Sequence, residues 1–184
     1  MIFKKNGILL FITLFFSVCY INAQDLITLS GHQDFKLLTI GDERGNAPGT
    51  LNLITTLKYE ASQQKLGFYV FGIDYEKANI KDGYKRYSGF VGYTFNFVFN
   101  DPKLKITPAI NYGKIVRRGK TSSSISGTIQ TAYNVSKKVR LSTKFQYKQR
   151  SDLKIAYNLN VVRSSFFVGL EIALFETKKT GCSL

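Results

Sequence analysis

The sequence has no tryptophan, a single histidine and only two cysteines among its 184 residues. One histidine excludes sites that need several imidazoles, and two cysteines are too few for the disulfide framework of a small secreted domain. The sequence also lacks a Gly-rich phosphate loop, a paired-cysteine motif and a carboxylate cluster of metal-binding spacing. We therefore predict no cofactor and no metal, and the length suits a single domain.

The first 23 residues have the layout of a secretory signal peptide. Lys4 and Lys5 precede an apolar stretch at 7–20, and Ala23 lies at the expected cleavage point. The apolar stretch is too short for a membrane-spanning helix. We expect the chain to be exported, which leaves Cys182 as its one thiol and allows no intramolecular disulfide.

Beyond residue 50, apolar and polar side chains alternate with the two-residue period of β-strands. Short turns rich in Asn, Asp, Ser and Gly separate the alternating segments, and links this short join antiparallel neighbours. The alternation predicts eight strands, over 50–61, 66–76, 88–99, 104–112, 125–133, 139–150, 155–161 and 166–174.

The two faces of these strands differ in a way that is typical of membrane barrels. One face of each clear strand carries no charge, whereas the other is polar and rich in small residues. Tyr and Phe recur near strand ends, as in interfacial aromatic girdles. Strands in a bilayer must close into a barrel because every backbone polar group needs an internal partner. The sequence therefore predicts an all-β, antiparallel up-and-down transmembrane β-barrel.

The barrel prediction divides the chain into four parts. These are a signal peptide at 1–23, an N-terminal extension or first hairpin at 24–49, the barrel at 50–176 and a tail at 177–184. Eight strands are preferred, and a hairpin at 24–49 would make ten.

The segment 169–175 reads Gly-Leu-Glu-Ile-Ala-Leu-Phe. It is similar to the C-terminal signal that the barrel-assembly machinery reads, with Gly169, Ile172, Leu174 and Phe175 at its characteristic positions. In that family the aromatic residue is often the last one, whereas here a tail follows it. With its signal peptide and amphipathic strands, the chain resembles the small outer-membrane β-barrels of Gram-negative bacteria, of OmpA/OmpX-like architecture. Residue usage also resembles that of Bacteroidota.

The resemblance implies a location in the outer membrane of the cell envelope. It also implies contact with outer-membrane lipids, insertion by the barrel-assembly machinery and a monomeric state. No nucleic-acid partner is expected for an exported barrel, although basic clusters at 85–86, 117–120, 137–140 and 178–179 could attract anionic headgroups. The simpler interpretation of these clusters is solvated loop charge.

Charged side chains on the predicted inward face are the main candidate site. They could line an anion-selective lumen or ligand cavity, or they could pair with one another and close the interior. Pairing is favoured, because side chains fill the interior of an eight-stranded barrel. The candidates are Lys58, Glu60, Asp74, Arg140, Lys144, Lys148 and Glu171, with Glu76, Arg150 and Lys154 on the same face.

Four functions are compatible with these features. The preferred one is non-enzymatic: a structural or surface-interaction protein with a narrow or plugged lumen. A small transport pore would need a continuous wet lumen, and a soluble periplasmic carrier of a lipophilic ligand, like a lipocalin, would turn the apolar face inward. A lipid-acting enzyme would use Ser30, His32 and Asp34 as a triad, although a simple loop or rim histidine is the preferred interpretation of His32.

Overall fold

The computed structural model describes residues 25–42, 45–61, 66–80, 82–96, 98, 101–158 and 162–176. The predicted signal peptide at 1–23, the tail at 177–184 and Cys182 lie outside the described residues. So do Phe97 and Phe99 of the strand predicted at 88–99, and residues 159–161 of the strand predicted at 155–161.

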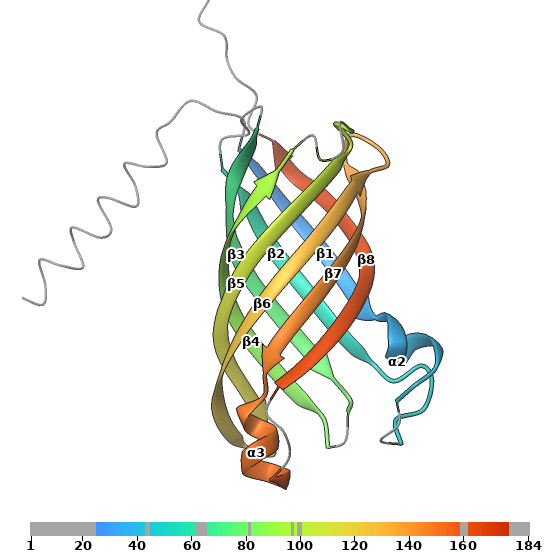
Figure 1. Cartoon of the computed structure of the whole chain (residues 1–184), viewed down its shortest axis with the longest axis vertical. Helices are drawn as coiled ribbons and strands as arrows, with labels where there is room; N and C mark the ends of the chain where they lie inside the picture. The colour runs from blue at the N-terminus through green and yellow to red at the C-terminus, as the bar shows by residue number, and fades with distance from the viewer. Residues whose placement is uncertain are drawn as a thin grey trace, which may run out of the picture.

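Eight antiparallel strands close into a barrel, in which each strand pairs with its neighbours in the chain and the last returns to the first (Figure 1). This architecture confirms the predicted fold class. Two short helices lie in the connections, α2 (Phe35–Thr39) and α3 (Ser151–Tyr157). The strands are β1 (Leu26–Asp34), β2 (Asn52–Glu60), β3 (Gly67–Ala78), β4 (Tyr84–Phe95), β5 (Leu104–Arg117), β6 (Lys120–Asn134), β7 (Val139–Gln149) and β8 (Val162–Glu176).

The two ends of the barrel differ. Leu26 at the start of β1 pairs with Glu176 at the end of β8, and we call this the terminus end. Helices α2 and α3 lie at the opposite end, which we call the loop end (Figure 1). There, Arg118 and Gly119 join β5 to β6 in a two-residue turn with φ angles of 49° and 72°. Positive φ at both positions is typical of a tight hairpin turn, so the turn predicted at 119–123 is shorter than expected.

The N-terminal part of the barrel corrects the sequence prediction. Residues 24–49 were expected to form an extension or a hairpin, but they contribute one barrel strand, β1, followed by α2. Asp34 ends the strand, because its carboxylate accepts a hydrogen bond from the backbone N–H of Leu37 at 3.2 Å and caps the helix. The barrel therefore begins at Leu26, and the ten-strand alternative is wrong.

The predicted strand at 155–161 is also wrong. Helix α3 occupies 151–157, with Asp152 in its first turn and Asn158 in the left-handed conformation at its C-terminus. The turn predicted at 163–165 lies within β8. The alternation of apolar and polar residues changes phase here because the chain passes from helix α3 to strand β8. Counting one strand too many here and one too few at the N-terminus still gave a total of eight.

The barrel has apolar side chains outside and mostly polar side chains inside, where Ile54, Val70 and Phe167 are among the few buried apolar ones. Outward-facing Ile73 and Ile110 are 62% and 64% exposed, whereas inward-facing Lys58 is 3% exposed. Neither helix in the described part of the chain is long and apolar enough to cross a bilayer.

Candidate functional site

Buried ion pairs occupy the interior from one end of the barrel toward the other. The cluster nearest the terminus end joins β2, β5, β7 and β8. The ammonium of Lys58 lies 2.9 Å from Glu60 and 2.8 Å from Glu171. Arg140 donates to both carboxylates at 2.5 Å, and Lys105 approaches Glu60 at 3.8 Å. Three cations thus neutralise two carboxylates that are fully buried.

The middle of the barrel is built around Asp74 on β3. Its carboxylate accepts hydrogen bonds from the Thr56 hydroxyl at 2.5 Å and from the Asn111 amide at 2.8 Å. Lys144 on β7 lies 3.4 Å from the same carboxylate and donates to Thr56 at 3.0 Å. A cavity of about 10 Å³ beside Lys58, Asp74 and Lys144 has room for about one water molecule.

A third cluster fills the interior toward the loop end. Lys148 on β7 donates to Glu76 on β3 at 2.5 Å, and the Tyr84 hydroxyl also donates to Glu76. The guanidinium of Arg86 lies 3.8 Å from Glu76. The guanidinium of Arg150 stacks on the Tyr84 ring, with its central carbon 3.9 Å from the ring centroid.

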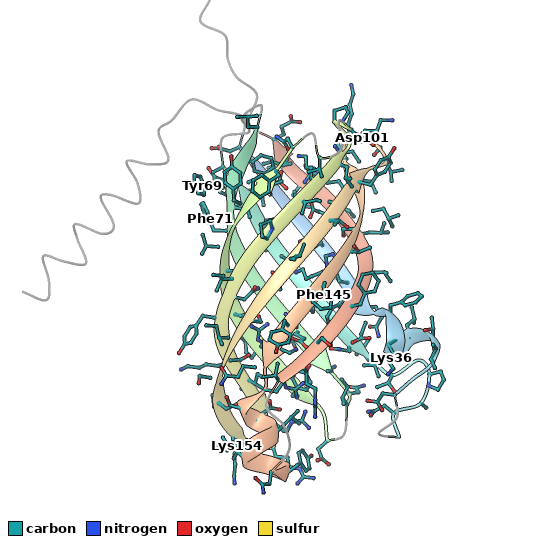
Figure 2. All side chains as sticks on the ribbon, in the orientation of Figure 1. Lys36, Tyr69, Phe71, Asp101, Phe145 and Lys154 are labelled. Atoms are coloured by element: carbon teal, nitrogen blue, oxygen red, sulfur yellow. The ribbon has the colours of Figure 1, made fainter. Side chains whose placement is uncertain are left out.

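The structure brings most of the predicted inward residues together. All seven predicted lumen charges are buried in the barrel, and so are Glu76 and Arg150. The prediction for Lys154 is wrong, because it lies exposed on α3 at the loop end (Figure 2). Lys154 does not point into the barrel because this part of the chain forms helix α3 instead of the predicted strand.

Three buried cations were missed by the sequence analysis: Arg86, Lys105 and Arg117. Arg86 and Arg117 had been assigned to basic loop clusters, because β4 begins earlier and β5 ends later than predicted. The signal was present in the sequence: Arg86 shares the alternation phase of Ser88, and Lys105 shares that of Thr107.

The outer surface of the barrel is apolar and suits contact with lipid rather than with water. Exposed aliphatic side chains, including Leu57, Val91 and Leu170, follow the middle of the strands. Aromatic side chains flank this band toward both ends, with Tyr69 and Phe71 toward the terminus end (Figure 2) and Tyr75 in tilted ring contact with Tyr87 toward the loop end. Soluble monomers rarely expose a continuous apolar belt of this kind. The belt and its flanking aromatic side chains are typical of a barrel that spans a bilayer.

Comparison with solved structures shows the same fold. The outer-membrane protein Ail of Yersinia pestis, in a phospholipid bilayer nanodisc, superposes with a TM-score of 0.53 at 11% identity, covering 83% of this chain and 99% of that one. The chain has the fold of the small outer-membrane β-barrels.

Other comparisons add no argument beyond that fold. A crystal structure of Ail, the attachment invasion locus protein of Yersinia pestis, gives a TM-score of 0.46 at 10% identity over 83% of this chain and 99% of that one. Neisserial surface protein A gives 0.44 at 15% identity over 82% and 96%. No protein-family model matches the sequence, and no curated protein matches it.

In this eight-stranded barrel, Ser30, His32 and Asp34 do not form a catalytic relay. His32 is fully buried, and its Nε2 lies 2.7 Å from the Ser142 hydroxyl, while its Nδ1 lies 3.4 Å from that of Ser30. Asp34 caps α2 and accepts from Asn52 at 3.1 Å. A triad requires the acid to orient the base, and here the acid serves the helix instead.

Two further observations limit what the barrel can hold. The carrier alternative needs an apolar interior, whereas the inward face is charged, so this prediction is wrong. Among the described residues, no group of three or more His, Cys, Asp or Glu side chains could hold a metal ion.

The connection around α3 is fastened to the barrel by charge. Asp152 accepts from Arg117 at 2.9 Å and from Arg150 at 2.8 Å. Burial acts to raise the pKa of Asp152, but the hydrogen bonds and charges of Arg150 and Arg117 outweigh it and lower that pKa below its ordinary value. At the surface, hydrogen bonds from Arg118 and Tyr157 likewise lower the pKa of Asp82.

Proposed function

We propose that the protein is an exported outer-membrane barrel with a closed lumen that acts through its loop end. The observation that carries this proposal is a set of ion pairs across the full diameter. Lys144 and Lys148 on β7 reach Asp74 and Glu76 on β3, and these strands lie opposite one another in a barrel of eight. Side chains that meet across the lumen leave no continuous aqueous path, which favours a structural or surface-interaction role over a transport pore.

The proposed orientation follows from the connections. In outer-membrane barrels the periplasmic turns are short and the extracellular loops are longer. At the loop end, the connections at 35–51 and 150–161 are long and carry helices, although those at 79–83 and 118–119 are short turns. The three connections at the terminus end, at 61–66, 96–103 and 135–138, are all shorter than these two long ones. The loop end would therefore face outward, and the terminus end would face the periplasm.

The remaining parts of the proposal concern export and assembly. The segment 1–23 would direct export and be removed, and the barrel would insert as a monomer among outer-membrane lipids. Strand β8 would be the segment read by the barrel-assembly machinery, since it carries Gly169, Ile172, Leu174 and Phe175 and closes the barrel by pairing with β1. Its last aliphatic and aromatic side chains point outward and are exposed, with Phe175 71% exposed.

Fractionation of native cells and heat-modifiability on a gel test the membrane assignment. We expect recovery in the outer membrane and a shift in mobility on boiling, because a closed barrel resists detergent until it is heated. Recovery in the soluble periplasm would contradict the assignment.

Conductance in planar bilayers tests the closed lumen. The heat-modifiable protein is expected to give no unitary current steps, and the same preparation after boiling serves as the control for contaminants. Reproducible steps from the folded sample alone would favour the transport-pore alternative instead.

A further inference from the structure

The strand pairing of the barrel wall is incomplete at the seam between its first and last strands, where helix α2 lies beside β8 and the Phe35 ring meets that of Phe166 edge-on. The pairing of β1 with β8 ends at Asp34 opposite Phe167, because Asp34 starts helix α2. Strand β8, however, begins at Val162 and pairs with β7 from its first residue. In the described structure, residues 162–166 of β8 therefore have no strand partner on the β1 side.

A cavity of about 380 Å³ lies at this gap. Its lining combines side chains from both sides of the wall: Tyr84 and Lys148 from the interior, and Phe145 and Phe166 from the outer surface. Since residues of opposite faces line one cavity, the cavity passes from the lumen mouth to the outside of the barrel. Its volume is within the range of small-molecule sites.

The polar part of the cavity favours an anion. Four basic side chains line it, Lys36, Lys148, Arg150 and Arg163, against two acidic ones. Both acidic side chains are engaged within the protein. Asp34 caps α2 and binds Asn52, and Asp42 accepts from the backbone and side chain of Asn46 at 3.1 and 2.8 Å.

The floor of the cavity closes it toward the lumen. Lys148 is held there by Glu76 and Tyr84, and Arg150 is held by Asp152. Lys148 shares the carboxylate of Glu76 with Arg86, and Arg150 shares that of Asp152 with Arg117, so positive charge is in excess at this floor. A ligand would meet this charge at the inner end and phenylalanine rings at the outer end, which suits a molecule with a charged head and an apolar tail.

We propose that the seam cavity binds the anionic headgroup of a lipid, with phosphate or carboxylate toward Arg163 and Lys148 and the acyl chain against Phe145 and Phe166. The proposal rests on the membrane location proposed above, since the tail would extend into the bilayer.

Calorimetric titration of the folded protein in phosphatidylcholine nanodiscs tests the proposal, with dodecyl phosphate as the probe and empty nanodiscs as the blank. We expect saturable binding of dodecyl phosphate, and binding of inorganic phosphate that is weaker by about tenfold or more because the tail contributes. A soluble anion site would instead bind the two probes equally, which would overturn the lipid assignment.

Two variants and one matched control locate the site. Arg163→Gln removes a lining charge and is expected to weaken binding of dodecyl phosphate about tenfold. Ser165→Phe fills the cavity without changing charge and is expected to abolish saturable binding. Lys120→Gln removes the same charge from an exposed residue outside the cavity and should change affinity by less than about twofold.

Heat-modifiability of each sample separates this proposal from the one it rests on. If the folded, membrane-integrated protein takes up no more dodecyl phosphate than empty nanodiscs, the cavity assignment is wrong while the barrel assignment stands. Equal weakening by Arg163→Gln and Lys120→Gln would indicate general surface charge and would also overturn it.

Discussion

At the scale of single residues, the fully buried Glu171 shows what closing the lumen requires. It accepts from Lys58 at 2.8 Å, from Arg140 at 2.5 Å and from Gln130 at 3.0 Å. Glu171→Gln leaves the three buried cations Lys58, Arg140 and Lys105 with Glu60 as their shared carboxylate, and we expect a loss of about 3 kcal/mol in the free energy of unfolding.

Urea unfolding in lipid vesicles measures this loss. Glu176→Gln, a change of the same kind at an exposed position of the same strand, should stay within about 0.5 kcal/mol of the wild type. Similar losses in both variants would mean that the internal pairs contribute nothing specific.

Gly169 has a steric reason for being glycine. A Cβ atom at this position would lie 2.0 Å from the backbone oxygen of Gly31, where β8 meets β1. Gly169→Ala should therefore destabilise the closed barrel by about 3 kcal/mol, because a backbone atom cannot move aside cheaply.

Folding yield, read from the heat-modifiable fraction, checks this expectation. Gly127→Ala is the control, since nothing lies within 4 Å of a Cβ built there. A normal yield for Gly169→Ala would show that the seam tolerates a wider strand separation.

At the scale of elements, helix α3 is held to the barrel by the ion pairs of Asp152 with Arg117 and Arg150, which we call the charge clamp, and protonation of Asp152 should break them. The pKa of Asp152 is lowered by Arg150 and Arg117 despite burial, so its ionised form stabilises the folded state. That stabilisation is complete above the ordinary pKa of 3.8 and is lost as the pH falls through the lower folded value. The pKa of Asp82 is also lowered, by hydrogen bonds from Arg118 and Tyr157.

Hydrogen-exchange protection factors for 151–157 measure the clamp. We expect them to fall below about pH 4 in the wild type, and Asp152→Asn should show low protection already at pH 6. Asp101→Asn, at the opposite end of the barrel, should leave them unchanged. Equal protection at pH 6 in wild type and Asp152→Asn would show that packing alone holds the helix.

At the scale of the whole molecule, the exposed apolar belt predicts how substitutions depend on depth. Ile110→Arg places a charge in the middle of the belt and should cost about 2–4 kcal/mol in a bilayer. Leu66→Arg, just before β3 at the terminus end, should cost less than about 1 kcal/mol. Unfolding in vesicles measures both, and equal small effects would be the behaviour of a water-exposed surface.

The sequence by itself determined the fold class and the two faces of the barrel. Alternation is a local property, since successive side chains of a strand point to opposite sides, so the inward positions of Lys58, Asp74 and Lys144 could be read without a structure. The apolar partner face, the aromatic strand ends and the short turns then pointed to a closed membrane barrel.

Only the tertiary structure decided which charges meet and where the wall is open. The pairs Lys144–Asp74 and Lys148–Glu76 join strands on opposite sides of the barrel, and no local pattern encodes contacts across the lumen. The strand predicted from residue 155 is a helix at 155–157, because a short alternating segment also fits a helical turn and the choice depends on Asp152 meeting Arg117 and Arg150. The seam cavity likewise arises from the offset between Asp34 and Val162, which becomes visible only when β8 lies beside β1.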